Sequence, residues 1–298
     1  MTVEQAICDL CGGQAFELLY PGTADVAEDP ALYYGSSRQK AGHLPIVRCR
    51  GCGLVLSNPR DDLATRRQAY AQLADEDYAA EEFARQWVAA QRLDWIEKWV
   101  DRARLIDVGC ATGVFVGQAL GRGWWAEGVD PSLWALARAR QRWPQARFHP
   151  GMLEDLPLPE QRFDVLTLWD VLEHVQSPTA LLSRAAEWVK PGGWLALNVP
   201  NVSSFSARWM GRRWVLLLRE HLWYFSPKTL RALLARTGWR LIALRPNRTV
   251  FSAANVLRRL AQYDLPGLRR ASDWPVLRRV WLPVWMGELN ALAQRVAE

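Results

Sequence analysis

Short apolar segments alternate with longer amphipathic segments through the middle of the chain. The clearest short segment is Leu105–Val108, whose apolar and β-branched side chains favour a buried strand. Similar strand signals recur at 125–129, 148–151, 165–168, 194–199 and 239–244, and helix signals lie between them. This alternation predicts an α/β fold in which helices cover both faces of a parallel sheet.

The two flanks of this region follow other patterns. Residues 61–104 predict helices, and the spacing near their end places four apolar residues on one buried face. These residues are Trp95, Ile96, Trp99 and Val100. Residues 253–285 alternate paired arginines with apolar residues, which favours a helical insertion with solvated arginines. A cover over a binding site, or a patch for an anionic headgroup, is the alternative interpretation.

A glycine loop follows the first strand of the alternating region. Gly109 and Gly113 bracket a tight turn before a helix, and glycines there let the backbone approach a ligand closely. Ala111 stands where a dinucleotide fingerprint needs its second glycine, and no Gly-Lys-Ser/Thr sequence follows. The loop is therefore neither a dinucleotide fingerprint nor a phosphate loop.

An acidic residue closes the second strand. Asp130 ends the strand at 125–129, and Pro131 lies at the start of the next helix. An acid about 20 residues beyond such a glycine loop can accept both hydroxyls of a ribose. The loop and Asp130 together indicate a nucleoside-binding site at the carboxyl ends of the strands.

Four cysteines form two Cys-x-x-Cys pairs, each followed by glycine. They are Cys8, Cys11, Cys49 and Cys52. Four thiolates in two such turns fit a closed, tetrahedral zinc site of structural type. Two disulfides are the alternative, which a reducing compartment disfavours.

Length, charge and terminal sequence limit the class of protein. The 298 residues, half of them hydrophobic, suffice for one large domain and a small one. The net charge of +6 allows nucleic acid or an anionic membrane surface as a partner but requires neither. No apolar run approaches membrane-spanning length, and the N-terminus does not have the regions of a signal peptide, so we expect a cytoplasmic protein.

Further polar residues follow the strand at 165–168 and precede the helix that begins at Pro227. Trp169 and Asp170 emerge at the carboxyl end of that strand, where open α/β sheets bind ligands. Farther along, Glu220 and His221 precede Ser226, which can cap the helix that begins at Pro227.

These stretches resemble class I S-adenosylmethionine-dependent methyltransferases, in particular the ubiquinone-biosynthesis-like branch. Asp107 to Gly113 is similar to motif I of that class, an acidic residue followed by G-x-x-x-G. Leu172-Glu-His174, Lys190-Pro-Gly-Gly193 and Pro200-Asn201 follow in the order of that branch, and the likeness covers about residues 105–245. The cysteine module resembles a companion of a subgroup that acts on sugars and other natural-product precursors.

The resemblance implies a Rossmann-like, seven-stranded sheet whose last strand runs antiparallel to the others. We expect that last strand within 286–298. The remaining divisions are a zinc-ribbon-like module at 1–60, a helical cap at 61–104, the cofactor domain at 105–252 and the insertion at 253–285.

The resemblance also implies the cofactor, S-adenosylmethionine, and the residues that hold it. These are Asp107, Gly109, Cys110, Ala111, Thr112, Gly113, Asp130, Pro131, Met152, Leu153, Trp169 and Asp170. Many family members carry an acid at the position of Met152, so this chain departs from the family at the expected adenine edge. Met152 could instead pack on the adenine face.

A methyl acceptor that is a hydroxyl or a carbon acid needs a base. His221, beside Glu220, is the first candidate, and His174 is the second, with packing at a helix start as its alternative role. In zinc-bearing sugar C-methyltransferases a tyrosine stands two residues ahead of the Glu-His pair, where this chain has Leu218. Tyr70 in the helical cap is interpreted as a packing residue or, alternatively, as a lid over the acceptor.

The hypothesis with most support is a methyltransferase of a small molecule, either a sugar, a natural-product precursor or a quinone-like precursor. The partner is then that acceptor and not a nucleic acid. An RNA methyltransferase whose zinc module binds RNA is the alternative, but lysines and arginines do not concentrate in residues 1–60. A non-catalytic protein that binds the cofactor is the third hypothesis.

Overall fold

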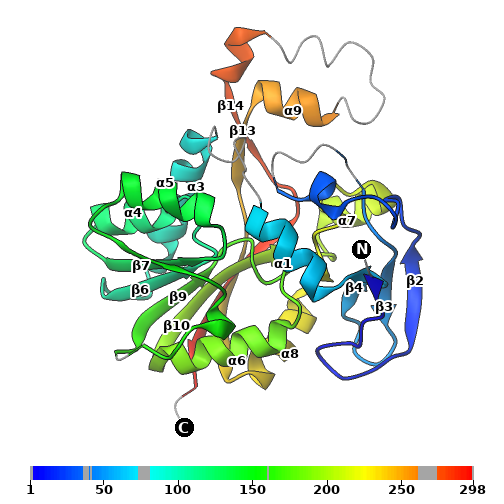
Figure 1. Ribbon diagram of the computed structural model, residues 1–298, viewed down its shortest axis with the longest axis horizontal. Coiled ribbons are helices and arrows are strands. Elements are labelled where there is room, and N and C mark those ends of the chain that lie inside the picture. Colours follow the sequence, from blue (N-terminus) through cyan, green and yellow to red (C-terminus); the bar gives the residue numbers. More distant parts are fainter. Residues whose placement is uncertain are drawn as a thin grey trace.

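The structure is a computed structural model of the chain (Figure 1). It describes residues 3–35, 40, 42–72, 81–159, 161–260 and 274–296.

A seven-stranded sheet forms the centre of the molecule, in the order β12-β15-β10-β9-β6-β7-β8. Its strands are β6 (Arg104–Val108), β7 (Trp125–Asp130), β8 (Arg147–Pro150), β9 (Phe163–Leu168), β10 (Val189–Pro200), β12 (Trp239–Pro246) and β15 (Glu288–Arg295). Strand β15 pairs antiparallel with both β10 and β12, while the pairs among β10, β9, β6, β7 and β8 are parallel. The expected Rossmann-like, seven-stranded fold is therefore confirmed.

Helices cover both faces of this sheet because its strands alternate their side chains between two cores. Leu105 packs in one core with α3 (Glu82–Ile96), α4 (Val114–Gly121) and α5 (Leu133–Arg142). Ile106 and Val108 pack in the other core with α6 (Pro178–Trp188) and α8 (Pro227–Arg236). Figure 1 shows the two helix layers on opposite sides of the strands. Ser226 caps α8 as expected, in a capping box with Thr229.

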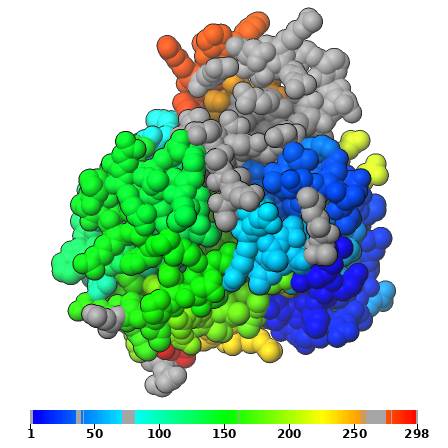
Figure 2. Space-filling model, viewed as in Figure 1, coloured from blue at the N-terminus to red at the C-terminus, as the bar shows by residue number. Residues whose placement is uncertain are grey.

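The N-terminal module contains two small sheets, and a later segment completes the larger one. Strands β1 (Val3–Glu4) and β5 (Arg60–Asp61) form a two-stranded sheet, and the 3-10 turn η1 (Pro30–Tyr33) also belongs to the module. The larger sheet contains β2 (Phe16–Tyr20), β3 (Ile46–Cys49) and β4 (Val55–Ser57). Strand β11 (Trp223–Tyr224) pairs with β4 and becomes the edge of this sheet. The module is thus joined to the segment that carries His221, and Figure 2 shows it packed with α1 (Leu63–Gln72) against the sheet domain.

Three local expectations differ from the structure. Trp99 is 46% exposed because α3 already ends at Ile96, so the helical spacing no longer applies to it. Residues 190–193 belong to β10 and mark a register shift against β9, whereas the predicted strand covered only 194–199.

The third difference concerns 253–285. Helix α9 covers Ala253–Leu260 and a 3-10 turn, η5, covers Pro275–Arg278, but Trp281–Val284 is a strand, β14, paired with β13 (Thr249–Ser252). Figure 1 shows β13 and β14 rising from the sheet as a two-stranded arm. Residues 261–273 of this stretch lie outside the described residues.

The short elements that remain are α7 (Phe205–Met210), η2 (Leu153–Asp155) and η3 (Gly211–Arg213). Among the helices that the structure describes, none combines the length and the apolar composition that crossing a membrane requires.

Candidate functional site

The glycine loop between β6 and α4 has no room for a side chain at Gly109. Gly109 has φ of +77°, and a Cβ there would lie 2.4 Å from a methyl carbon of Val171. The N–H groups of Gly109 and Cys110 both donate to the carbonyl of Val129, at 2.8 and 3.0 Å. These bonds fix the loop against the end of β7, where Asp130 lies.

Asp130 is held by two amides on either side of its carboxylate. Its Oδ2 accepts the N–H of Ala111 at 2.8 Å, and its Oδ1 accepts the N–H of Ser132 at 2.8 Å. Burial raises the pKa of this carboxyl, and the two amides act in the opposite direction. The acid thus joins the glycine loop to the N-terminus of α5.

Asp107 lies beneath the loop at the end of β6. Its Oδ1 accepts a hydrogen bond of 2.5 Å from the hydroxyl of Thr167 on β9. Burial raises the pKa of Asp107 to about 7, although Thr167 and Arg92 favour the charged form. Asp107 is therefore a buried carboxyl close to the loop, and both its protonated and its charged form occur near neutral pH.

Asp170 is placed by a strained backbone and three polar contacts. Its φ is +59°, and its N–H and Oδ1 both bind the side-chain amide of Asn198 at 2.7 Å. Arg92 Nη2 lies 3.4 Å from Oδ2, and the Arg92 guanidinium stacks over Trp169 with 4.4 Å to the ring centroid. Burial would raise the pKa of Asp170, but Arg92 and Asn198 outweigh burial and lower it.

Most of the expected cofactor residues line one cavity of about 560 Å³. They are Gly109, Ala111, Thr112, Asp130, Pro131, Met152, Leu153, Trp169 and Asp170. Asp107 and Cys110 line an adjoining cavity of about 210 Å³, which shares Gly109, Trp169 and Asp170 with the first. Gly113 lines neither cavity; it is the N-cap of α4 with φ of +74°.

The candidate bases line the same large cavity as the glycine loop. His174 Nδ1 is 3.0 Å from the carbonyl oxygen of Glu220, and His221 Nδ1 is 2.9 Å from the carbonyl oxygen of Leu216. A carbonyl oxygen only accepts, so we assign the proton of each neutral ring to Nδ1. Nε2 of each ring then carries the lone pair that a base needs.

Two further residues extend this group. The Tyr70 hydroxyl lies 2.9 Å from His174 Nδ1, and the Glu173 carboxyl is buried with no hydrogen-bond partner for Oε2. Burial raises the pKa of Glu173 and lowers that of His174, which favours the neutral form of both. Ligand atoms of Glu173, His174 and His221 lie within 4.8 Å of one another, a set that could also hold a divalent cation.

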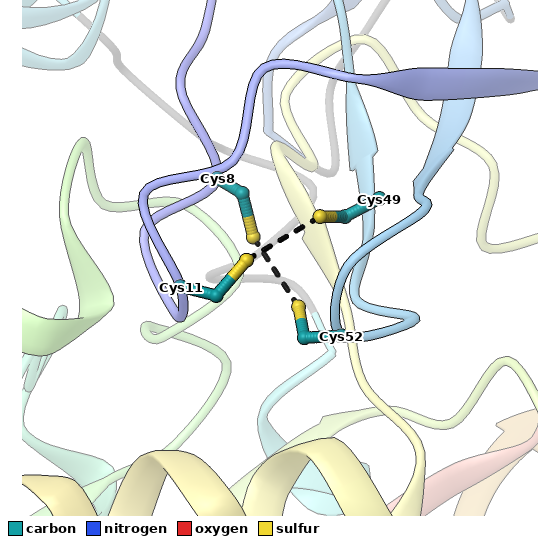
Figure 3. A group of neighbouring side chains, drawn as sticks. All are labelled: Cys8, Cys11, Cys49 and Cys52. Atoms are coloured by element: carbon teal, nitrogen blue, oxygen red, sulfur yellow. Dashed lines mark hydrogen bonds between the residues drawn. The ribbon is translucent and has the colours of Figure 1, made fainter.

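The four N-terminal cysteines form a second site (Figure 3). Cys8 Sγ is 3.4 Å from Cys52 Sγ, and Cys11 Sγ is 3.5 Å from Cys49 Sγ. These separations exceed a disulfide bond of about 2.05 Å and approach the roughly 3.8 Å between sulfurs around tetrahedral zinc. Burial opposes ionisation of Cys49, but the amides of Cys52 and Gly51 outweigh it and lower the pKa of that thiol to about 7.

Comparison with known proteins agrees with this geometry. Residues 67–244, more than half of the chain, match the family described as a methyltransferase domain. The chain belongs to this methyltransferase family. Its sheet and its glycine loop are those of the class I, S-adenosylmethionine-dependent type.

Curated relatives of this methyltransferase include two ubiquinone biosynthesis O-methyltransferases. The protein from Leptothrix cholodnii is 31% identical over 139 residues, which cover 42% of this chain and 58% of the relative. The protein from Thiobacillus denitrificans is 30% identical over 146 residues, which cover 43% of this chain and 59% of the relative. The chain therefore spans somewhat more than half the length of these relatives.

Solved structures share the fold of this methyltransferase at low identity. A complex of the Haloferax volcanii Trm112 methyltransferase activator with a methyltransferase matches with a TM-score of 0.53 and 17% identity, covering 77% of this chain and 97% of that chain. A methyltransferase from Thermotoga maritima matches with a TM-score of 0.50 and 17% identity, covering 74% and 95%. At this identity the likeness concerns the fold alone.

Sequence reasoning missed Arg92 and Glu173 as members of the methyltransferase's cavities. Arg92 occupies the buried face of α3 together with Ala89, Leu93 and Ile96. A charged residue at an apolar position of an amphipathic helix was the available signal. Glu173 was read only as part of a motif, because nothing in the local sequence reveals that its carboxyl is buried.

Proposed function

We propose that this methyltransferase transfers the methyl group of S-adenosylmethionine to a small-molecule acceptor bound beside His174 and His221. The observation that carries the proposal is the single cavity that the glycine loop, Asp130 and both histidines line together. A cavity lined by both sets of residues can bring a donor and an acceptor into contact.

In the proposed cofactor pose, Asp130 accepts the ribose hydroxyls and the glycine loop faces the methionine part. Met152 and Leu153 border the adenine. Arg92, which borders the smaller cavity with Asp107 and Gly109, is suited to the cofactor's carboxylate. The bound sulfonium supplies an activated methyl group, so the protein chiefly aligns the acceptor and excludes water.

We propose His221 as the first candidate base, with His174 as the second and Glu220 as a neighbour that influences both. Nε2 of either ring is suited to accept the proton of an acceptor hydroxyl while the methyl group is transferred. The names of the O-methyltransferase relatives support an oxygen acceptor on a quinone-like or other natural-product precursor. Methylation at carbon of a sugar is the alternative that the cysteine module supports.

We also propose a structural zinc ion at Cys8, Cys11, Cys49 and Cys52. The donor set fits: the four sulfur atoms lie within 4.8 Å of one another, and the cysteines are free of disulfides. Zinc would cross-link the two Cys-x-x-Cys turns of the N-terminal module, whose buried apolar residues pack in clusters shared with the rest of the chain. No role in methyl transfer is assigned to this ion.

The test of the proposed function is a methyl-transfer screen with labelled S-adenosylmethionine. Prenylated phenols, nucleotide sugars and glycosylated intermediates are the acceptors to include, and RNA is the comparison. Transfer to a small molecule that is lost in Asp130→Ala supports the proposal. Transfer to RNA alone contradicts it.

A further inference from the structure

Four arginines are buried among the residues that the structure describes, and they differ in their partners. They are Arg60, Arg66, Arg92 and Arg219. Three of them face a carboxylate: Arg60 pairs with Glu4, Arg92 with Asp170 and Arg219 with Asp61. Arg66 instead contacts a neutral group, since its Nη1 donates to the side-chain oxygen of Gln176 at 3.0 Å.

Arg219 shows how a buried guanidinium is satisfied in this fold. Its Nε and Nη2, which form one edge of the planar group, donate to the two oxygens of Asp61 at 2.9 and 2.8 Å. In Arg66 the corresponding Nε is buried without a hydrogen-bond partner, as is the Nε of Arg92. Arg92 nevertheless pairs with Asp170, whereas Arg66 is only 4% exposed and makes no ion pair with a carboxylate of the described residues. A guanidinium stays charged at any relevant pH, so burying it without a counter-ion is unfavourable.

The position of Arg66 indicates where a counter-ion would come from. Arg66 lies on α1 and lines the 560 Å³ cavity with Tyr70, His174 and Gln176. Glu220 lies on the same wall, and its carboxylate accepts the N–H of Gly35 at 3.0 Å. The Arg66 side chain therefore borders the acceptor side of the cavity and not the glycine loop.

We propose that the methyl acceptor carries an oxyanion, a carboxylate or a phosphate, that pairs with Arg66. This inference rests on the proposed function, because it assigns the substrate class of the same cavity. The pair would give the Arg66 guanidinium the ion pair that it does not make with any carboxylate of the described residues. It would also fix the orientation of the acceptor relative to His174 and His221, because a guanidinium binds oxygen anions in a defined plane.

The test uses small anions as probes of the full-length protein saturated with S-adenosylhomocysteine. Benzoate, its neutral isostere benzamide, and inorganic phosphate are titrated by calorimetry into wild type, Arg66→Met and Arg67→Met. Arg67 is the matched control, because it lines the same cavity but is half exposed and already pairs with Asp155. Affinity for S-adenosylmethionine is measured on each variant in parallel.

We expect benzoate or phosphate to bind wild type and Arg67→Met, with affinity about 10- to 100-fold lower in Arg66→Met, as for one lost charged hydrogen-bond pair. Benzamide should bind all three proteins equally weakly. Preference for benzoate identifies a carboxylate acceptor, and preference for phosphate identifies a phosphorylated one. If Arg66→Met does not fold, Arg66→Lys is used instead. Lysine keeps the positive charge but does not have the planar guanidinium, so anion affinity should still fall.

Equal anion affinity in wild type and Arg66→Met, with intact cofactor binding in both, overturns the inference and leaves the proposed function standing. Absence of anion binding to wild type overturns it in the same way. Failure of wild type to bind S-adenosylmethionine contradicts the proposed function instead. An Arg66-dependent anion response would in that case still support the oxyanion site.

Discussion

The imidazole rings of His174 and His221 meet edge to face, with 4.7 Å between ring centroids and 76° between ring planes. One ring follows β9 of the central sheet, and the other precedes β11 of the N-terminal sheet. Each Nδ1 lies within hydrogen-bond distance of a backbone carbonyl, so both rings are oriented by the main chain. Burial lowers the pKa of His174, which favours the neutral form of that ring near pH 7.

The first prediction concerns the base. His221→Ala should lower turnover by about 10²–10⁴-fold, the usual contribution of a general base. Affinity for S-adenosylmethionine should stay unchanged, because the ring is expected to touch only the acceptor. Turnover of an acceptor from the screen and calorimetry of the cofactor measure the two effects. Normal turnover in this variant, with loss in His174→Ala, would transfer the role to His174.

The second prediction is the pH dependence if His174 is the base. Burial lowers the pKa of His174 below the ordinary value, although Glu220 and its carbonyl favour the protonated ring. A base acts when it is deprotonated, so kcat/KM should fall on acidification only at a pH below about 6.5. His174→Gln should abolish that acid limb. An acid limb that persists in the variant would assign it to another group.

The third prediction concerns zinc. Protein purified without added metal should contain about one zinc per chain, because the four cysteine sulfurs form a closed tetrahedral donor set. Cys49→Ser should lose most of the metal, whereas Cys110→Ser should keep it, since Cys110 lies in the glycine loop. Mass spectrometry showing a Cys8–Cys11 disulfide and no metal would contradict the assignment.

The fourth prediction concerns the buried ion pair that joins β5 to the segment before β11. Arg219 and Asp61 are almost fully buried, with side chains 0% and 2% exposed. Arg219→Met leaves Asp61 buried without its partner, so it should reduce the free energy of unfolding by about 3–5 kcal/mol. Urea unfolding measures this loss. Arg67→Met, which breaks an ion pair between the exposed Arg67 and Asp155, should cost far less; equal costs would refute the special role of the buried pair.

Local pattern sufficed for most of the fold because the strands of the central sheet are short apolar runs with clear boundaries. The last strand, β15, was expected only from the resemblance, since Glu288–Arg295 reads Glu-Leu-Asn-Ala-Leu-Ala-Gln-Arg and has poor strand propensity. Its neighbours β10 and β12 impose the strand by pairing with it on both sides. Strand β14 was missed because it pairs with β13, about 30 residues earlier in the chain, and the local pattern does not contain that contact.

Local pattern was less informative for the site. The glycine loop and Asp130 follow two neighbouring parallel strands, whose carboxyl ends lie at the same edge of the sheet, so their contact was predictable. The pairing of Arg219 with Asp61, and the approach of Tyr70 to His174, join distant segments and depend on how the N-terminal sheet docks. No spacing rule contains that information. The cofactor and acceptor roles of these residues stay predictions until binding is measured.

In the proposed cofactor pose, S-adenosylmethionine binds at the glycine loop with its ribose on Asp130. Calorimetric titration of the cofactor into wild type and Asp130→Ala tests it most directly, with Asp94→Ala as the control and thermal unfolding as the check on folding. We predict that Asp130→Ala loses at least about 1.5–3 kcal/mol of binding free energy, the value of one charged hydrogen bond, while Asp94→Ala binds as wild type does. Unchanged cofactor affinity in folded Asp130→Ala would contradict the account.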